Sequence, residues 1–328
     1  MLFDFLVSHL FRHKYNNKIL LHEQIFLFIE LFYYICKEYR NRTSPVPSRD
    51  TAHRPLRDME SLWLKRMKTI TFFNEKGGMG KTTFSVMFAS WLKYSKGYKV
   101  LGMDFDNPNF PFLHIRKTDQ ALLDSGEKNL REFCDGRAPY EIKAMTSADI
   151  GSEAGLTRTI TALRRMREEG GEGYVVIDFP GRFQPNDPIV KIASAGQIDL
   201  FVFPIDTDAQ SQRSALRISQ DMLRSQRFRQ LSGKPSGQSI LFFWNRVTRG
   251  ERQSTSRDWF DAMNDTLGMM GIPVATEMMP MTESAKRDAD TFGFIRSTMC
   301  WPERNIKMRC PNIIKLFEEI KRHLDNAK

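Results

Sequence analysis

The stretch that decides the fold is TITFFNEKGGMGKTT, residues 69–83. Its first five residues predict a strand, and the residues from Thr82 to Lys96 predict a helix. Between them lies a glycine-rich loop. Glycines let the backbone approach phosphate oxygens without a Cβ in the way, and successive N–H groups at a helix N-terminus bind anions. The order strand, loop, helix therefore predicts a phosphate-binding loop, or P-loop.

Several residues of this loop can be given roles. Lys81 would contact the β- and γ-phosphates of a bound nucleotide, and Thr82 would place its hydroxyl on Mg²⁺. We expect the loop to bind the nucleotide through Gly77, Gly78, Gly80, Lys81, Thr82 and Thr83. The usual pattern G-x-x-x-x-G-K-[ST] starts with glycine, whereas this loop has Glu75 at that position.

The run KGGMGKTT, residues 76–83, resembles the deviant P-loop of the ParA/MinD family of P-loop ATPases. In that family the first position is often not glycine, and an early lysine reaches across a dimer to the partner's ATP. Lys76 matches that lysine, so the resemblance implies a catalytic role for Lys76 beside Lys81. The resemblance covers roughly Met67 to Lys328, and it implies a P-loop NTPase of the SIMIBI class.

Two further apolar runs end in acidic residues. VLGMDFD, residues 100–106, resembles the family segment that holds a Mg²⁺-bound water and positions the attacking water, which implies these roles for Asp104 and Asp106. YVVIDFPG, residues 174–181, resembles the family's second acidic strand, which implies that Asp178 lies in the outer shell of the metal. Gly181 departs from the family, which usually has a second proline there.

Two later segments resemble the parts of the family that surround the adenine base. LFFWNR, residues 241–246, carries Asn245, whose amide offers a donor and an acceptor to a base edge. The alternative for Asn245 is a plain turn former. MMP, residues 278–280, resembles the segment that flanks the base, which implies that Pro280 contacts the nucleotide.

From Met67 onward strand-like and helix-like runs alternate, which is typical of an α/β domain with a mostly parallel sheet flanked by helices. Strands are predicted at 68–74, 98–104, 174–179, 200–205, 239–245 and 273–279. Helices are predicted at 82–96, 155–169, 208–231, 255–268, 282–290 and 311–326. Residues 107–150 lack a clear period, and we expect a partly helical region there. Phosphates should bind at the carboxyl ends of the strands.

Residues 1–66 differ in composition from the ATPase domain expected at 67–328. Residues 1–41 are crowded with aromatic and aliphatic side chains, and 41–57 resemble a proline-containing linker. Charges at Glu23 and Glu30 disfavour a membrane-spanning helix. Three interpretations stay open: an amphipathic helical appendage, an anchor for a membrane or a partner, or a segment outside the native protein.

The chain is basic, with a formal net charge of +10 among 328 residues. This charge favours an acidic partner such as nucleic acid or an anionic membrane. Arginines grip phosphates without reading sequence, and the predicted DNA contacts are Arg213, Arg217 and Arg224, which recur at helical spacing. Four cysteines without a C-x-x-C pair argue against a zinc ribbon or a disulfide framework and favour a reducing cytoplasm.

The C-terminal helix places Ile313, Phe317, Ile320 and Leu324 on one stripe. Proteins like MinD end in a helix that binds membranes, so two interpretations compete. The helix is short and mixed in charge, and we expect it to dock on the core.

The resemblance implies a Mg²⁺-dependent ATP hydrolase that forms a homodimer on ATP and binds DNA without sequence preference. It implies a cytoplasmic, nucleoid-associated protein that serves partition or conjugative transfer through a separate adaptor protein. The first alternative is a MinD-like ATPase that positions itself on a membrane. The second is a metabolic P-loop enzyme of the dethiobiotin synthetase type, which Lys76 disfavours.

Overall fold

The computed structural model describes residues 66–126, 138–231, 239–251, 254–281, 297–301 and 312–327, with backbone alone at 224–231 and 254–257. All of them belong to one compact unit, Pro55–Lys328. The predicted N-terminal segment, apart from Arg66, and the predicted helix at 282–290 lie outside the described residues.

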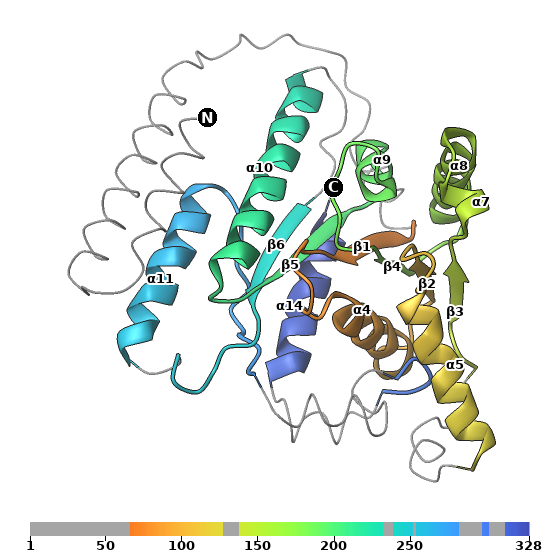
Figure 1. Ribbon diagram of the computed structural model, residues 1–328, viewed down its shortest axis with the longest axis horizontal. Coiled ribbons are helices and arrows are strands. Elements are labelled where there is room, and N and C mark those ends of the chain that lie inside the picture. The colour runs from red at the N-terminus through yellow and green to blue at the C-terminus, as the bar shows by residue number, and fades with distance from the viewer. Residues whose placement is uncertain are drawn as a thin grey trace, which may run out of the picture. The chain divides into compact units, whose positions relative to one another are not determined.

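The described strands form one six-stranded sheet in the order β3-β2-β4-β1-β5-β6 (Figure 1). Their bounds are β1 Lys68–Phe72, β2 Val100–Asp104, β3 Glu141–Ala144, β4 Tyr174–Asp178, β5 Leu200–Ile205 and β6 Ser239–Trp244. Every pairing in this sheet is parallel, so the carboxyl ends of all six strands share one edge. The chain leaves β1 for β2, but β4 lies between them. Such a switch in strand order is where α/β sheets bind ligands.

Helices cover both faces of the sheet (Figure 1). Their bounds are α4 Lys81–Ser90 with a π-helical continuation to Ser95, α5 Pro111–Asp124, α7 Ser147–Ile150, α8 Glu153–Glu169, α9 Pro188–Ser194, α10 Ala209–Leu231, α11 Ser254–Met269 and α14 Asn312–Asn326. One buried cluster joins the sheet to α4, α5 and α14, and the other joins it to α8, α9, α10 and α11. The unit therefore has three layers, helices, sheet and helices.

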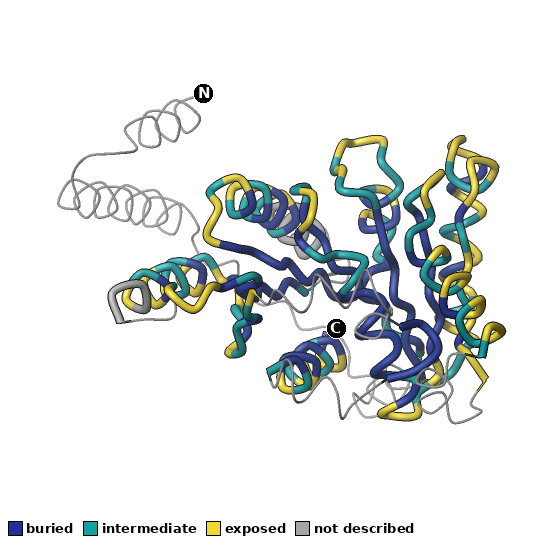
Figure 2. Tube along the Cα trace, turned by 60° about the horizontal axis from the view of Figure 1, so that its bottom comes forward, coloured by how far each residue is buried: buried dark blue, intermediate teal, exposed yellow. Residues whose placement is uncertain are grey.

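Strand β6 shows how the sequence builds these two clusters. Ile240, Phe242 and Trp244 lie in one cluster, whereas Leu241 and Phe243 lie in the other. Side chains of a strand alternate between faces, and a sheet covered on both faces needs an apolar residue at nearly every position. The tube in Figure 2 is accordingly dark blue along the central strands.

Five of the predicted strands are confirmed, and the sixth is wrong. Residues 273–279 make only isolated bridges, Phe242 with Val274 and, just beyond, Val247 with Pro280. Prolines at 273 and 280 bracket this stretch, and proline has no N–H to donate to a ladder. The expected partly helical region between 107 and 150 contains α5 and α7, but it also supplies the unpredicted edge strand β3.

The C-terminal helix docks on the core, as expected. Five of its apolar side chains are buried: Ile313, Leu316, Phe317, Ile320 and Leu324. The ring centroid of Phe317 lies 5.3 Å from that of Phe88 in α4. No helix within the described residues is long and apolar enough to cross a membrane.

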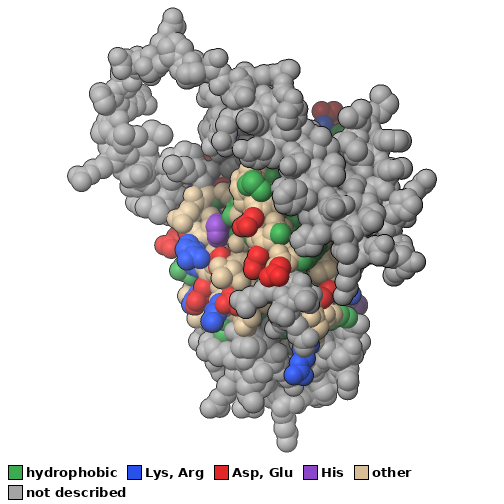
Figure 3. All heavy atoms as spheres, turned by 90° about the vertical axis from the view of Figure 1, so that its left-hand side faces the viewer, with side chains coloured by type: hydrophobic (Ala, Val, Ile, Leu, Met, Phe, Trp, Pro, Cys, Tyr) green, Lys and Arg blue, Asp and Glu red, His purple; other side chains and the backbone are tan. Residues whose placement is uncertain are grey.

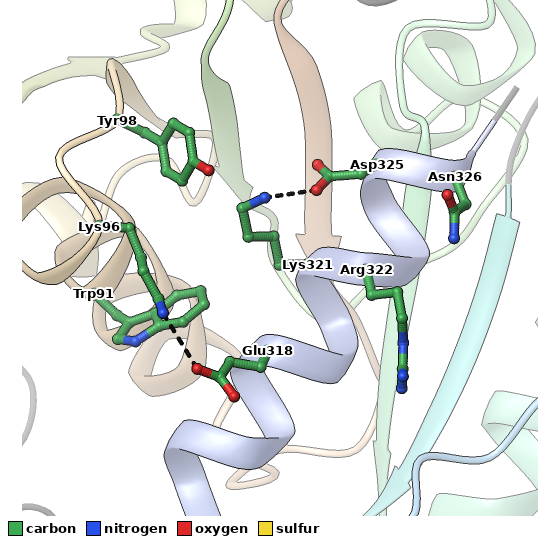
Figure 4. A pocket seen from close by; sticks show the side chains of 8 residues that line it. All are labelled: Trp91, Lys96, Tyr98, Glu318, Lys321, Arg322, Asp325 and Asn326. Carbon is green, nitrogen blue, oxygen red and sulfur yellow. Dashed lines mark hydrogen bonds and ion pairs between the residues drawn. The ribbon is translucent and has the colours of Figure 1, made fainter.

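A hollow of about 340 Å³ lies beside the end of α14 (Figure 4). Its lysines already have partners, since Lys321 lies 2.6 Å from Asp325 and Lys96 lies 3.2 Å from Glu318. The hydroxyl of Tyr174, the first residue of β4, also donates to Asp325 at 2.8 Å. These contacts fasten α14 to the amino ends of the strands, away from the P-loop.

Candidate nucleotide-binding site

The P-loop joins β1 to α4 at the carboxyl edge of the sheet. Gly78 and Gly80 have φ angles of 75° and 83°, a region that L side chains rarely adopt. A Cβ at Gly80 would also lie 3.2 Å from the ring of Phe84. Gly77 and Gly78 are exposed. The loop therefore presents bare backbone at the N-terminus of α4, as phosphate binding requires.

Two buried asparagines brace this loop from below. Asn74 donates its amide to the carbonyl of Pro204 at 2.9 Å and accepts the backbone N–H of Lys76 at 2.9 Å. Asn245 donates to the carbonyl of Met79 at 2.9 Å. The predicted contact of Asn245 with adenine stays a prediction, but the structure already uses its amide to hold the P-loop. Pro280 lies nearby in sequence pairing, bridged to Val247, and its contact with the base also stays a prediction.

Lys81 points back over the loop. Its Nζ lies 3.5 Å from the carbonyl oxygen of Lys76. Burial lowers the pKa of Lys81, and the charges of Asp178 and Asp106 oppose this shift. A Cβ at Gly181 would lie 3.1 Å from this Nζ and 3.0 Å from the carbonyl oxygen of Glu75. The departure from the family at Gly181 thus leaves room for the P-loop lysine.

Thr82 and Asp178 meet at the end of β4, which lies beside β1. The Thr82 hydroxyl donates to Asp178 Oδ2 at 2.7 Å. Burial raises the pKa of Asp178 to about 7, against the lowering effect of the bond from Thr82, while the charge of Asp104 raises it further. A cation beside these oxygens would relieve that burial cost.

This donor set fits Mg²⁺. The ion prefers oxygen ligands and usually takes one or two carboxylates together with substrate phosphates. Thr82 and Asp178 would hold it beside the P-loop. Within the described ranges, no three or more His, Cys, Asp or Glu side chains gather as a metal site, so the phosphates and waters would supply the remaining ligands.

Asp104 and Asp106 follow β2 at the same edge. Both oxygens of Asp104 accept backbone N–H groups: Oδ2 from Phe112 at 2.8 Å and Leu113 at 3.1 Å, and Oδ1 from Asp106 at 3.1 Å. Burial raises the pKa of Asp104, and these bonds oppose the shift. Asp104 thus anchors the start of α5 and the backbone of Asp106, which is half-buried. The proposed roles of both residues at metal and water stay predictions.

Lys76 has partners within its own chain. Its Nζ lies 3.1 Å from Asp206 Oδ2 and 3.4 Å from Asp208 Oδ1, and Arg246 Nη1 lies 3.9 Å from the same Asp206 oxygen. Sequence reasoning missed Asp206 and Asp208. The signal was available, because Asp206 directly follows an apolar strand, as Asp178 ends one.

The three predicted DNA contacts separate in the structure. Arg217 Nη2 donates to Glu75 Oε2 of the P-loop at 2.6 Å, so Arg217 lies beside the nucleotide site. Arg213 is exposed on α10, and the side chain of Arg224 lies outside the described residues.

The side of the unit that carries α11 is acidic (Figure 3). A groove of about 600 Å³ there is lined by Glu251, Asp261, Asp265 and Glu277, among others. Acidic side chains repel phosphates, so the described part of this side does not suit DNA.

Comparison with known proteins adds to this geometry. Residues 67–131 match a protein family described as an AAA domain. No curated protein sequence matches the chain significantly.

Solved structures similar to this chain include three ATPases. An ATP complex of a Cyanothece McdA variant is 19% identical, with 79% of this chain and 96% of that chain covered and a TM-score of 0.49. A ParA family ATPase from Chlorobium tepidum TLS is 16% identical, with 71% and 91% covered and a TM-score of 0.45. The MinD cell division protein of Aquifex aeolicus is 18% identical, with 68% and 84% covered and a TM-score of 0.40.

A bare glycine loop between β1 and α4, with Lys81, Thr82 and Asp178 gathered around it, defines a P-loop ATPase. The family match over residues 67–131 covers this loop and the acidic strand that follows it. The predicted assignment is confirmed: this is a P-loop ATPase of the ParA/MinD type.

Proposed function

We propose that this protein is an ATP-hydrolysing switch that dimerises on ATP and binds DNA without sequence preference. The observation that carries the proposal is the second lysine of the P-loop. Lys76 faces Asp206 and Asp208 at the rim of the site rather than its own glycine loop. An ammonium at the rim is available to a second subunit, whereas Lys81 serves the nucleotide of its own chain.

The residues of the site divide the chemistry among them. Backbone N–H groups of the P-loop and Lys81 bind the phosphates, and Mg²⁺ held by Thr82 and Asp178 neutralises part of their charge. Asp106 orients the attacking water. Lys76 from the partner subunit stabilises the charge that develops in the transition state. Hydrolysis removes the γ-phosphate, which ends the dimer and releases DNA.

The basic charge of the chain supports DNA as the partner. The net charge is +10, and the exposed Arg213 lies on α10 with Arg224 further along the same helix. Dimerisation would double this basic surface and steepen its salt dependence. We further propose that the cargo is a plasmid, chromosome or conjugative element, attached through a separate adaptor protein in the cytoplasm.

A charge-reversal experiment tests the DNA surface. Arg213→Glu with Arg224→Glu should abolish co-sedimentation with two unrelated DNA duplexes in the presence of ATP, while ATP binding is kept. Arg217 is left unchanged because it contacts the P-loop. The matched control reverses Arg158 and Arg164, which are exposed on α8 and should keep DNA binding.

The same assay separates the alternative function. If the wild type ignores DNA but sediments with anionic liposomes, the MinD-like membrane ATPase replaces our proposal. If both double variants lose DNA equally, overall charge rather than the α10 surface explains the binding.

The ATPase domain is proposed to need no residue before Arg66. Arg66 lies 3.0 Å from Asp199, which also pairs with Arg167, so deletion should stop at residue 65. The shortened protein should fold and keep ATP hydrolysis. An insoluble product would show that the deleted segment covers apolar surface of the domain.

A further inference from the structure

The first position of the P-loop carries a negative charge. Glu75 stands where the usual pattern has glycine, directly before the lysine and the glycines that would face phosphates. Its side chain is 24% exposed, so it lies at the margin of the site. ATP brings several negative charges to this loop. A free carboxylate at this position would repel them.

Helix α10 takes up this charge. Glu75 Oε2 accepts from Arg217 Nη2 at 2.6 Å and from the Ser214 hydroxyl at 3.0 Å. The backbone N–H of Glu75 also points to the Ser214 oxygen, at 3.4 Å. One turn of α10 therefore holds both the side chain and the backbone at the start of the P-loop. An ion pair of this length between arginine and carboxylate is a charge-assisted hydrogen bond.

We infer that Arg217 is a positioning residue of the nucleotide site: it neutralises Glu75 and holds the carboxylate against α10, away from the bound phosphates. This inference rests on the proposed function, because it assumes that ATP occupies the P-loop. It gives Arg217 a role in nucleotide binding in place of the DNA contact predicted from helical spacing.

The size of the effect follows from exposure. The side chain of Arg217 is 51% exposed, and solvent weakens such pairs. Loss of Arg217 should therefore weaken ATP binding by about two- to fivefold, the range that an exposed ion pair supports. The effect should shrink as salt is raised, since salt screens exposed charges.

A double-mutant cycle tests the inference with full-length protein and labelled ATP, without DNA. Arg217→Ala should weaken ATP binding, whereas Arg217→Lys should keep most of it because the charge remains. In a Glu75→Gln background, Arg217→Ala should have no effect, because no charge is left to neutralise. Arg213→Ala is the control: it removes an equal charge from the same helix one turn earlier.

The outcomes are distinct. An equal loss from Arg217→Ala in both backgrounds would mean that Arg217 only supports the helix, and unchanged ATP binding would mean that Glu75 is harmless without it; either result overturns the inference. An equal loss from Arg213→Ala would point to general charge and overturn it too. A wild type that binds no ATP would instead overturn the proposed function itself.

Discussion

Replacing Asp208 by Asn should promote ATP-dependent dimerisation. Lys76 is held in its own chain by two carboxylates, at 3.1 Å from Asp206 and 3.4 Å from Asp208. To reach the partner's ATP, Lys76 must leave both. Asn removes one of the two charges. It also keeps the start of α10, because Asp208 Oδ1 accepts the N–H of Gln210 at 2.8 Å and Asn is an equally good cap.

The magnitude follows from the exposure of the pair. The Asp208 side chain is 52% exposed, and exposed ion pairs contribute about 0.2–1 kcal/mol. Two lysines leave their partners when a symmetric dimer forms, so the gain is about 0.4–2 kcal/mol for the dimer. The dissociation constant of the ATP-bound dimer should therefore fall by roughly two- to thirtyfold.

Light scattering against protein concentration, with saturating ATP and Mg²⁺, measures this constant. Asp187→Asn at the start of α9 is the matched control, since Asp187 also precedes a helix and makes no printed contact with Lys76. An Asp208→Asn dimer that is as weak as the wild type, or weaker, would refute the reasoning, because it would mean that the contacts of Lys76 in its own chain do not oppose dimerisation.

Three further predictions concern the site and the core. Asp106→Ala should dimerise on ATP but hydrolyse it poorly, since orienting water matters only for chemistry; phosphate release and light scattering on one sample check both. Gly181→Ala should weaken ATP binding roughly fivefold, from an overpacking cost of about 1 kcal/mol where the new Cβ meets Lys81 Nζ and a backbone oxygen; unaltered affinity in a titration would exclude that contact. Burial lowers the pKa of His323 below 6.5, so the unfolded chain takes up the proton first and stability falls as pH drops through 6.5. His323→Gln should flatten this part of a pH series of urea unfolding curves, and an unchanged slope would contradict the assignment.

The parts of the fold that a short sequence pattern specifies could be predicted. The P-loop needs glycines with positive φ and a lysine at fixed spacing, and both acidic strands are apolar runs that end in aspartate. These features are local, so the sequence alone places them. The edge strand β3 escaped because Glu141–Ala144 is only four residues long and alternates exposed with half-buried positions, a pattern too short to separate from a loop.

The partners of the site residues depend on the strand order, which no local pattern contains. Asp206 meets Lys76 because β5 lies beside β1. Arg217 meets Glu75 because α10 follows β5 and passes the P-loop. Helical spacing alone showed only that Arg213 and Arg217 share a face, and it could not show that Glu75 lies opposite one of them.

The most direct test of the central claim is the affinity of the full-length protein for one fluorescent DNA duplex, measured by anisotropy with ATP and with ADP at several salt concentrations. We predict tight binding with ATP, weak binding with ADP and a steeper salt dependence for the ATP state, because the dimer contacts more phosphates than the monomer. Equal affinity and equal salt dependence in the two nucleotide states would contradict an ATP-driven DNA-binding switch.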